Sequence, residues 1–203
     1  MAVDRRARHR HDAGPGGHRI QRRLRVGQHQ CLVQVGCTWE VVSDGSQTLR
    51  QSNAGSENAR EFAGDATWTD YTVSARVKPL TFGSGGFAGL LARSTSSTTF
   101  YRLALLSGQV QLQAVNSGSV TVLASSTRTV SINTWYTLGL AVSGSTISAT
   151  VDGTSIGSGT SSVSTAGRIG VQTGYSSAGF DDVVVSTGGS TTPTTPPATS
   201  SPT

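Results

Sequence analysis

The chain has 203 residues, a formal net charge of +5 and a pI near 9.9, and its length suits one β-domain with flanking segments. A basic balance usually points to a nucleic acid or an anionic surface as partner. However, residues 1–37 hold eight of the 16 Lys and Arg and two of the 11 acids. Residues 38–203 keep eight basic and nine acidic groups, net −1, which argues against nucleic-acid binding there. No apolar run reaches the roughly 18 residues of a membrane-spanning helix.

Residues 1–37 lack apolar periodicity and hold all four His and both Cys. Three interpretations stay open: a disordered basic arm for polyanions, a metal site, and coding DNA read out of frame. The metal site would use His9, His11, His18, Cys31 and Cys37, without a CxxC pattern. Shifting the frame of plausible codons for residues 23–36 gives DFESGNTSAWSKSG, a typical opening of a secreted β-sandwich. No stretch in this segment resembles the apolar part of a signal peptide.

From residue 38 onward, short alternating segments separated by turn residues predict β-strands. The first half contains Thr38–Ser43, Gln47–Ser52, Asn58–Phe62, Tyr71–Leu80, a glycine-rich loop Thr81–Gly86, and Phe87–Arg93. The next strands are Phe100–Leu106, Gln109–Val115 and Val120–Ala124. Two more strands, Arg168–Thr173 and Phe180–Ser186, follow a glycine-serine stretch around Ile156. No segment favours a helix.

The clearest signal is the hairpin between Tyr136 and Val151, in which apolar residues alternate with small or polar ones on both sides of the turn Ser143–Ser145. This period of two predicts strands with one buried face. Turn signals spaced about every 8–12 residues predict an all-β, two-sheet antiparallel jelly-roll sandwich over residues 38–186. Residues 187–203 form a Ser/Thr/Pro-rich linker, too polar to build a core.

Several segments together resemble one group of domains. They are TWEVVSDG, Gln51-Ser52, WTDYTVSARVKPL, GLLAR, FYRLALLSG, TWYTLGLAVSG and GFDDVVV. These segments are similar to the concanavalin A-like lectin/glucanase jelly rolls, in particular to LamG-like modules found beside actinobacterial pectate lyases and other secreted polysaccharide-degrading enzymes. The resemblance covers about residues 38–186 and implies an extracellular, carbohydrate-related role. It is weakly informative about activity, because this fold carries many functions.

Catalytic patterns are not met in residues 38–203. This part of the chain has no His, so the G-x-S-x-G match at Gly153–Gly157 lacks a base and is not a nucleophile elbow. Glycosidases of this fold pair carboxylates along one strand in a pattern like E-x-D-x-x-E. The Glu residues here, Glu40, Glu57 and Glu61, do not form that pattern. We therefore predict no catalytic residue in the domain.

Polar-facing strand positions give the candidate binding residues Arg76, Lys78, Arg93, Arg102, Gln111 and Gln113. If their strands share a sheet, its open face is basic, and arginine pairs bidentately with carboxylates such as those of a uronate polysaccharide. Solvent-facing charges that suppress edge aggregation are the alternative. Trp68 and Tyr175 are candidate stacking residues for a sugar ring, or rim residues of the sandwich.

The resemblance also implies a structural calcium ion, with Asp182 as a ligand and its partner acid in the shifted-frame DFE segment. The combined prediction is a monomeric, non-catalytic carbohydrate-binding or accessory module of a secreted enzyme, with a pectin-like polysaccharide as partner. A structural or adhesion LamG-like module is the alternative, and a lyase or glycosidase domain is a third.

Overall fold

The computed structural model describes residues 38–187, which form eleven β-strands and contain no helix. The first strands are β1 (Trp39–Ser43), β2 (Gln47–Gln51), β3 (Ala59–Ala63) and β4 (Tyr71–Ser96). The middle strands are β5 (Thr99–Leu106), β6 (Gln109–Asn116), β7 (Ser119–Thr127) and β8 (Tyr136–Ser143). The last are β9 (Thr146–Val151), β10 (Thr154–Thr160) and β11 (Arg168–Ser186). Every strand pairing is antiparallel, so the predicted all-β class is confirmed.

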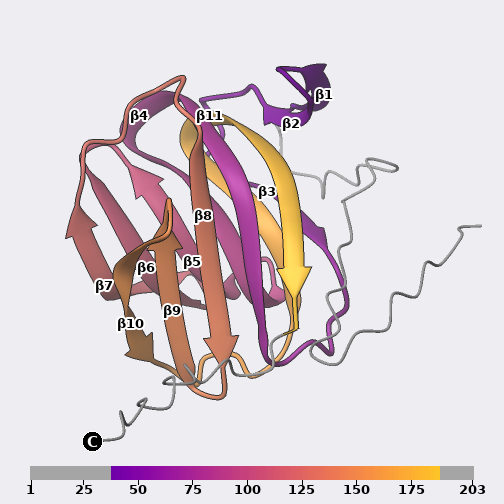
Figure 1. Ribbon diagram of the computed structural model, residues 1–203, viewed down its shortest axis with the longest axis vertical. Coiled ribbons are helices and arrows are strands. Elements are labelled where there is room, and N and C mark those ends of the chain that lie inside the picture. The colour runs from indigo at the N-terminus through magenta and orange to yellow at the C-terminus, as the bar shows by residue number, and fades with distance from the viewer. Residues whose placement is uncertain (1–37, 188–203) are drawn as a thin grey trace, which may run out of the picture.

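The strands form two layers that face each other as a jelly-roll sandwich (Figure 1). The first layer has the order β1-β2-β11-β4-β8-β9-β10, and the second has the order β3-β11-β4-β5-β6-β7. Strands β4 and β11 belong to both, because their halves pair with different neighbours. The start of β4 pairs with β8, whereas its end pairs with β5.

The glycine-rich segment predicted as a loop is the bend where β4 passes from one layer to the other. A Cβ atom at Gly83 or Gly86 would lie 2.7 or 2.5 Å from the carbonyl oxygen of Tyr175 in β11. Only glycine permits this close approach of two backbones. The prediction of two strands on either side of a loop, 71–80 and 87–93, is therefore corrected to one continuous bent strand. The same holds for 168–173 and 180–186, which are parts of β11.

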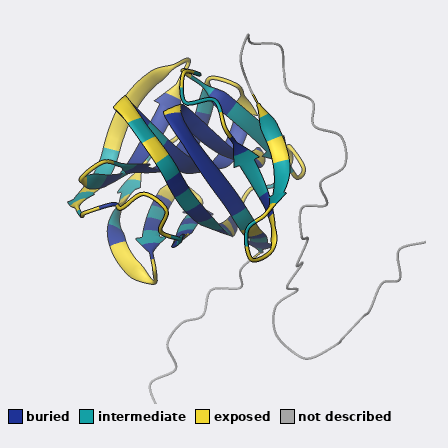
Figure 2. Cartoon of the chain, turned by 90° about the horizontal axis from the view of Figure 1, so that it is seen from above, coloured by how far each residue is buried: buried dark blue, intermediate teal, exposed yellow. Residues whose placement is uncertain are grey.

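The core lies between the layers. Apolar residues alternate with small or polar ones along the strands, so every second side chain turns inward. Leu138, Leu140 and Val142 of β8 are almost fully buried, as are Ile147 and Val151 of β9. Figure 2 shows the buried residues gathered on the strands between the two layers. The predicted hairpin is thus confirmed, and it supplies much of the first layer's inner face.

At one side the two layers approach closely enough to close the sandwich. Gly157 and Gly159 of β10 lie against β7, where added Cβ atoms would come within 2.8 Å of Ala124 Cβ and 2.9 Å of Leu123 Cβ. The glycine-serine stretch around Ile156 is therefore a strand selected for small side chains. The interpretations of residues 1–37 and of the linker beyond residue 187 lie outside the described residues.

Across residues 38–187, no helix is present that has the length and apolar character needed to cross a lipid bilayer.

Candidate functional site

The four predicted basic residues do not share one face. Arg76 and Lys78 lie on the outer face of the first layer, beside Trp135 at the start of β8. The Arg76 guanidinium carbon is 4.6 Å, and the Lys78 ammonium 5.1 Å, from the centroid of the Trp135 ring. Lys78 also forms an ion pair with Asp44. These cations are therefore held by an aromatic ring and a carboxylate.

Arg93 is buried at one end of the sandwich and does not lie on a polar face. Its φ of 46° is left-handed and coincides with an irregularity in the pairing of β4 with β5 between Ala92 and Ser96, so the strict alternation breaks there. Its guanidinium donates to the carbonyl oxygens of Thr69 (2.7 Å) and Gly144 (2.7 Å). The sequence-based placement of Arg93 on a polar face is therefore wrong.

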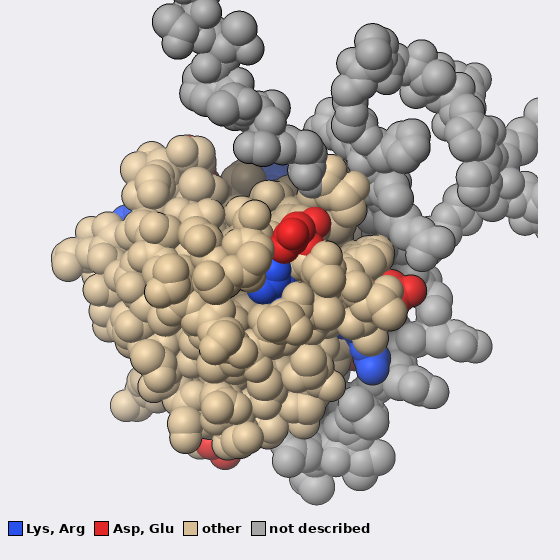
Figure 3. All heavy atoms as spheres, turned by 90° about the horizontal axis from the view of Figure 1, so that it is seen from below, with Lys and Arg blue, Asp and Glu red and all other residues tan. Residues whose placement is uncertain are grey.

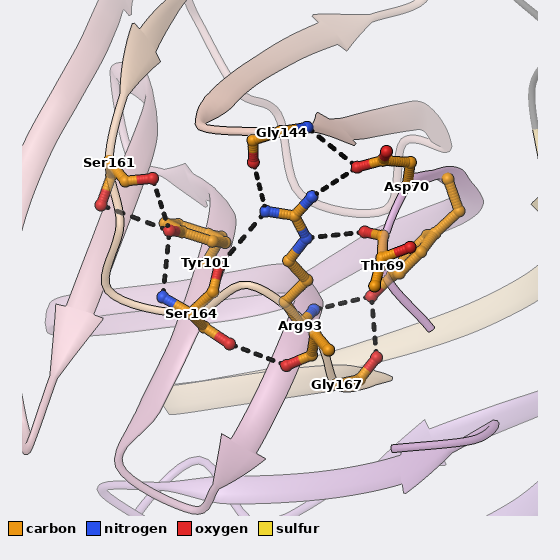
Figure 4. A network of polar contacts seen from close by, with 10 residues as sticks. Thr69, Asp70, Arg93, Tyr101, Gly144, Ser161, Ser164 and Gly167 are labelled. Carbon is orange, nitrogen blue, oxygen red and sulfur yellow. Dashed lines mark hydrogen bonds and ion pairs between the residues drawn. The ribbon is translucent and has the colours of Figure 1, made fainter. Parts of the chain in front are cut away.

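Arg93 organises the loops at this end of the molecule (Figure 4). It pairs with Asp70 at 2.8 Å and donates to the Ser164 carbonyl at 3.3 Å. The Tyr71 hydroxyl accepts from the Arg93 amide at 2.6 Å and donates to the Gly167 carbonyl at 3.2 Å. Burial raises the pKa of Tyr71 to about 12, although the contact with Arg93 acts in the opposite direction. Figure 3 views the sandwich from the end where β8 stops, and shows basic and acidic side chains lying side by side there.

Arg102 differs from Arg93 in its partners. It alternates in β5 with the core residues Leu103 and Tyr101, so it lies on the outer face of the second layer, yet it is only 7 % exposed. Its Nε donates to Gln113 Oε1 at 2.7 Å, and its Nη1 donates to Gln172 Oε1 at 3.0 Å. Both partners are neutral amides.

These contacts belong to a longer hydrogen-bonded series, which we call the amide–arginine ladder. Its members, in the order in which hydrogen bonds join them, are Arg60, Asn58, Gln172, Arg102, Gln113, Gln111 and Gln109. Consecutive members are 2.6 to 3.1 Å apart. Cross-strand register explains the ladder, because Arg102 faces Gln113 and Arg60 faces Gln172. Of the predicted residues, the structure thus brings together Arg102, Gln111 and Gln113.

An aromatic ring and small residues support the ladder. The Arg102 guanidinium carbon lies 4.0 Å from the centroid of the Phe87 ring, a distance suited to a cation–π contact. Gly89 and Ala104 lie on the same face of the second layer, in register with each other. A Cβ atom at Gly89 would approach Arg102 Cγ to 3.3 Å. The sheet therefore leaves space for the arginine side chain to lie flat along it.

Desolvation lowers the pKa of Arg102 to about 10, with a smaller contribution from the positive charge of Arg60. The guanidinium is still charged near neutral pH. No ion pair joins Arg102 to a carboxylate of residues 38–187. Its Nη2 atom makes no hydrogen bond within those residues and is not among the fully enclosed polar atoms without a partner. Arg102 is thus a largely buried cation with one donor nitrogen left for a further partner.

The two predicted stacking residues have different environments. Trp68 is half-buried, and its ring meets that of Tyr71 edge-on with centroids 5.9 Å apart. It also covers Gly64, where a Cβ atom would lie 2.5 Å from the ring. Tyr175 is 43 % exposed and has a left-handed φ of 44° at the β11 bend. Trp68 therefore packs as a rim residue, and Tyr175 presents its ring to solvent.

Asp182, the predicted calcium ligand, lies beside a basic side chain. Its carboxylate lies 3.7 Å from the Arg76 guanidinium, and the neighbouring Asp181 accepts from Ser46. No group of three or more His, Cys, Asp or Glu residues suited to a metal occurs in residues 38–187. The expected partner acid falls outside that range, so calcium binding stays a prediction.

Five members of this site were missed from the sequence: Arg60, Asn58, Gln172, Gln109 and Phe87. Asn58 precedes β3 and Gln172 comes from β11, about 70 residues after Arg102 in the chain. Their proximity depends on which strands pair, and local alternation carries no information about pairing. The local signals were the outward parity of Gln172 in β11 and the spacing of Gln109, two residues before Gln111 in β6.

Comparisons with known proteins agree with this architecture. The Laminin G domain family matches residues 87–178, which include the second half of β4 and most of β11. No curated protein sequence matches the chain. Among solved structures, carbohydrate binding module CBM66 from Bacillus subtilis is similar with a TM-score of 0.66 and 16% identity, over 75% of this chain and 92% of that one.

Two further structures show the same likeness. A Bacillus subtilis protein of unknown function with a galectin-like fold has a TM-score of 0.57 and 13% identity, over 74% of this chain and 87% of that one. Alginate lyase A1-II' has a TM-score of 0.52 and 14% identity, over 74% and 83%. The described part of this chain therefore shares the jelly-roll fold of these structures, and residues 87–178 are similar to Laminin G domains.

Proposed function

We propose that this chain is a non-catalytic carbohydrate-binding accessory module of a secreted polysaccharide-degrading enzyme, and that it binds saccharide at the amide–arginine ladder. The observation that carries the proposal is the ladder itself. Asparagine, glutamine and arginine side chains are planar groups with several hydrogen-bonding atoms each. A continuous row of them on one sheet face matches the closely spaced hydroxyl groups of a sugar chain. Phe87 and the exposed ring of Tyr175 add apolar surface for sugar C–H groups.

The proposed ligand is an acidic, pectin-like polysaccharide. Arg102 is buried and charged, and no carboxylate of the described residues pairs with it. Burying a charge is costly unless a counter-charge and hydrogen bonds compensate. A uronate carboxylate would supply both. The basic residues on the first layer are not part of the proposed site.

The fold likenesses support a saccharide ligand without fixing it. One similar structure is named a carbohydrate binding module and another an alginate lyase. The ladder itself consists of amides and guanidinium groups, so it offers no paired carboxylates for glycosidase chemistry and no histidine base. Binding is therefore the function that its chemistry suits.

The test is affinity electrophoresis of the full chain through gels that contain polygalacturonate, alginate, xylan or cellulose derivatives. We expect retention by the acidic polysaccharides, and about a tenfold weaker retention for Arg102→Ala, equivalent to about 1.4 kcal/mol for a lost charged hydrogen bond. Arg76→Ala is the matched control, because it removes the same charge from the other layer. Equal loss in both variants, or unchanged retention of Arg102→Ala, would contradict the proposal.

A structural or adhesion module is the second candidate, and the match to Laminin G domains favours it. Such a module would pass through every polysaccharide gel without retardation.

A further inference from the structure

The hydrogen bonds of the ladder have a fixed direction, and Arg102 sets it. A guanidinium group can only donate. The amides of Gln113 and Gln172 must therefore turn their oxygens toward Arg102 and their NH₂ groups away from it. This chemical constraint determines the orientation of both amides, which geometry alone leaves open because amide oxygen and nitrogen have similar shapes.

The same direction continues along both arms of the ladder. On one side, Gln113 Nε2 donates to Gln111 Oε1 at 2.6 Å, and Gln111 Nε2 donates to Gln109 Oε1 at 3.1 Å. On the other side, Gln172 Nε2 donates to Asn58 Oδ1 at 3.1 Å. Every amide oxygen in the ladder already accepts a hydrogen bond. The capacity left for a ligand consists mainly of N–H donors.

We infer that the ladder selects the ionised, unesterified carboxylate of a uronate and discriminates against its methyl ester; the inference rests on the proposed function of the ladder. An ionised carboxylate only accepts hydrogen bonds, with about four lone-pair positions on its two oxygens. A methyl ester is neutral, and its carbonyl oxygen is its one good acceptor. A donor-rich surface around a cation therefore favours the free acid.

Arg102 Nη2 is the proposed point of contact. It is the guanidinium nitrogen that the ladder leaves without a partner, and it is not fully enclosed. Gln113 and Gln172 occupy Nε and Nη1 and act as positioning residues, while Phe87 supports the guanidinium plane. Hydrogen bonds between a guanidinium and a carboxylate are about twice as strong as neutral ones, so esterification removes the strongest contact.

One variant would give Arg102 a carboxylate partner from the protein itself. Gln113→Glu has nearly the same shape and places a carboxylate next to Arg102 Nε, where Gln113 Oε1 now lies at 2.7 Å. This internal carboxylate neutralises the cation that the ligand would otherwise use. Gln47→Glu is the matched control, because it makes the same change of charge at an exposed position of β2, outside the ladder.

The experiment measures binding of the full chain to a pectin series, from fully de-esterified to highly methyl-esterified. We expect affinity to fall at least about tenfold across the series, the factor that corresponds to one charged hydrogen bond. Gln113→Glu should lose at least about tenfold on the de-esterified sample, and Gln47→Glu no more than about twofold, as expected for an exposed charge. Unchanged circular dichroism and an equal or higher melting temperature would show that Gln113→Glu is folded.

The outcomes separate the two proposals. Binding that is independent of esterification, or equal losses in the two Glu variants, would overturn the selectivity while leaving carbohydrate binding at the ladder in place. Binding to none of the pectins and to none of the neutral polysaccharides would overturn both.

Discussion

Two arginines are buried within residues 38–187, and they differ in what surrounds their charge. Arg93 is 1 % exposed and meets the Asp70 carboxylate and three backbone carbonyls. Arg102 is 7 % exposed and meets two amide oxygens and a phenyl ring. Because a buried charge requires compensation, Arg93 is neutralised by a carboxylate of the fold, whereas the proposed function assigns the counter-charge of Arg102 to a ligand. Burial alone therefore does not separate a structural arginine from a binding one, whereas the charge of its partners does.

The largest effect is expected at Arg93. Arg93→Met removes the donor from three loop carbonyls, each costing about 1 kcal/mol or more when left without a partner. We expect a loss of about 3 kcal/mol of unfolding free energy, which lowers the melting temperature by roughly 6–12 °C for a domain of this size. Urea denaturation and thermal melts measure both. Arg76→Met, whose ion pair is exposed, should cost about 0.5 kcal/mol. Equal losses would contradict the structural role of Arg93.

Tyr71 belongs to the same hydrogen-bonded region as Arg93, and its hydroxyl makes the free energy of unfolding depend on pH. Tyr71→Phe should cost about 1–2 kcal/mol, because the Arg93 amide and the Gly167 carbonyl lose their partner. The pKa of Tyr71 is raised from 10.0 to about 12. Between these values the unfolded chain loses the hydroxyl proton and the folded chain keeps it, so the stabilisation present below pH 10.0 is lost as pH rises toward 12. Urea denaturation at pH 9 to 11 should show this decline in the wild type relative to Tyr71→Phe. Parallel curves would contradict it.

A smaller change in stability is expected on substitution of Arg102. The contribution of Arg102 to stability depends on pH in the opposite sense to that of Tyr71. Arg102→Met should change stability by less than about 1 kcal/mol at neutral pH, because a desolvated charge is removed along with its hydrogen bonds. Desolvation lowers the pKa of Arg102 from the ordinary value of an arginine to about 10, so the unfolded chain binds the proton more tightly. The cost of the charge is therefore present below pH 10 and is lost as pH rises above that value. Denaturation of both forms at pH 8 and 11 measures the difference. A loss at neutral pH as large as that of Arg93→Met would contradict the contrast.

The smallest effect is expected on removal of divalent cations. The Asp182 carboxylate faces Arg76, and residues 38–187 hold no metal-binding group of acids. EDTA should therefore shift the melting temperature by less than about 1 °C, well within the shift that 1 kcal/mol causes. A fall of several degrees that added calcium reverses would instead support the calcium ion expected at Asp182.

The sequence predicted the fold better than it predicted the site. Alternation along Tyr136–Val151 is enough to define a strand pair, because each buried residue is separated from the next by an outward one. The same reasoning failed at Arg93, whose left-handed backbone turns it into the sandwich. It also divided β4 at the glycines of 83–86, since glycine signals a turn and a close backbone contact equally well.

The sequence predicted only part of the ladder, because the remaining members are brought there by long-range strand pairing. Arg102, Gln111 and Gln113 are outward residues of neighbouring strands joined by a short turn, so local pattern places them together. Asn58 and Gln172 reach the same face through the pairing of β11 with β3 and β4. Such long-range pairing is decided by the whole core rather than by either segment.

The central claim, that Arg102 meets the ligand and Arg93 does not, is tested most directly by NMR of the arginine Nε–H groups. Each Nε–H gives a separate signal, which responds to a charged group that comes into contact with the same guanidinium. On titration with de-esterified oligogalacturonate, the Arg102 signal should shift progressively to saturation while the Arg93 signal stays in place. Binding that leaves the Arg102 signal unmoved, or moves that of Arg93 instead, would contradict the account.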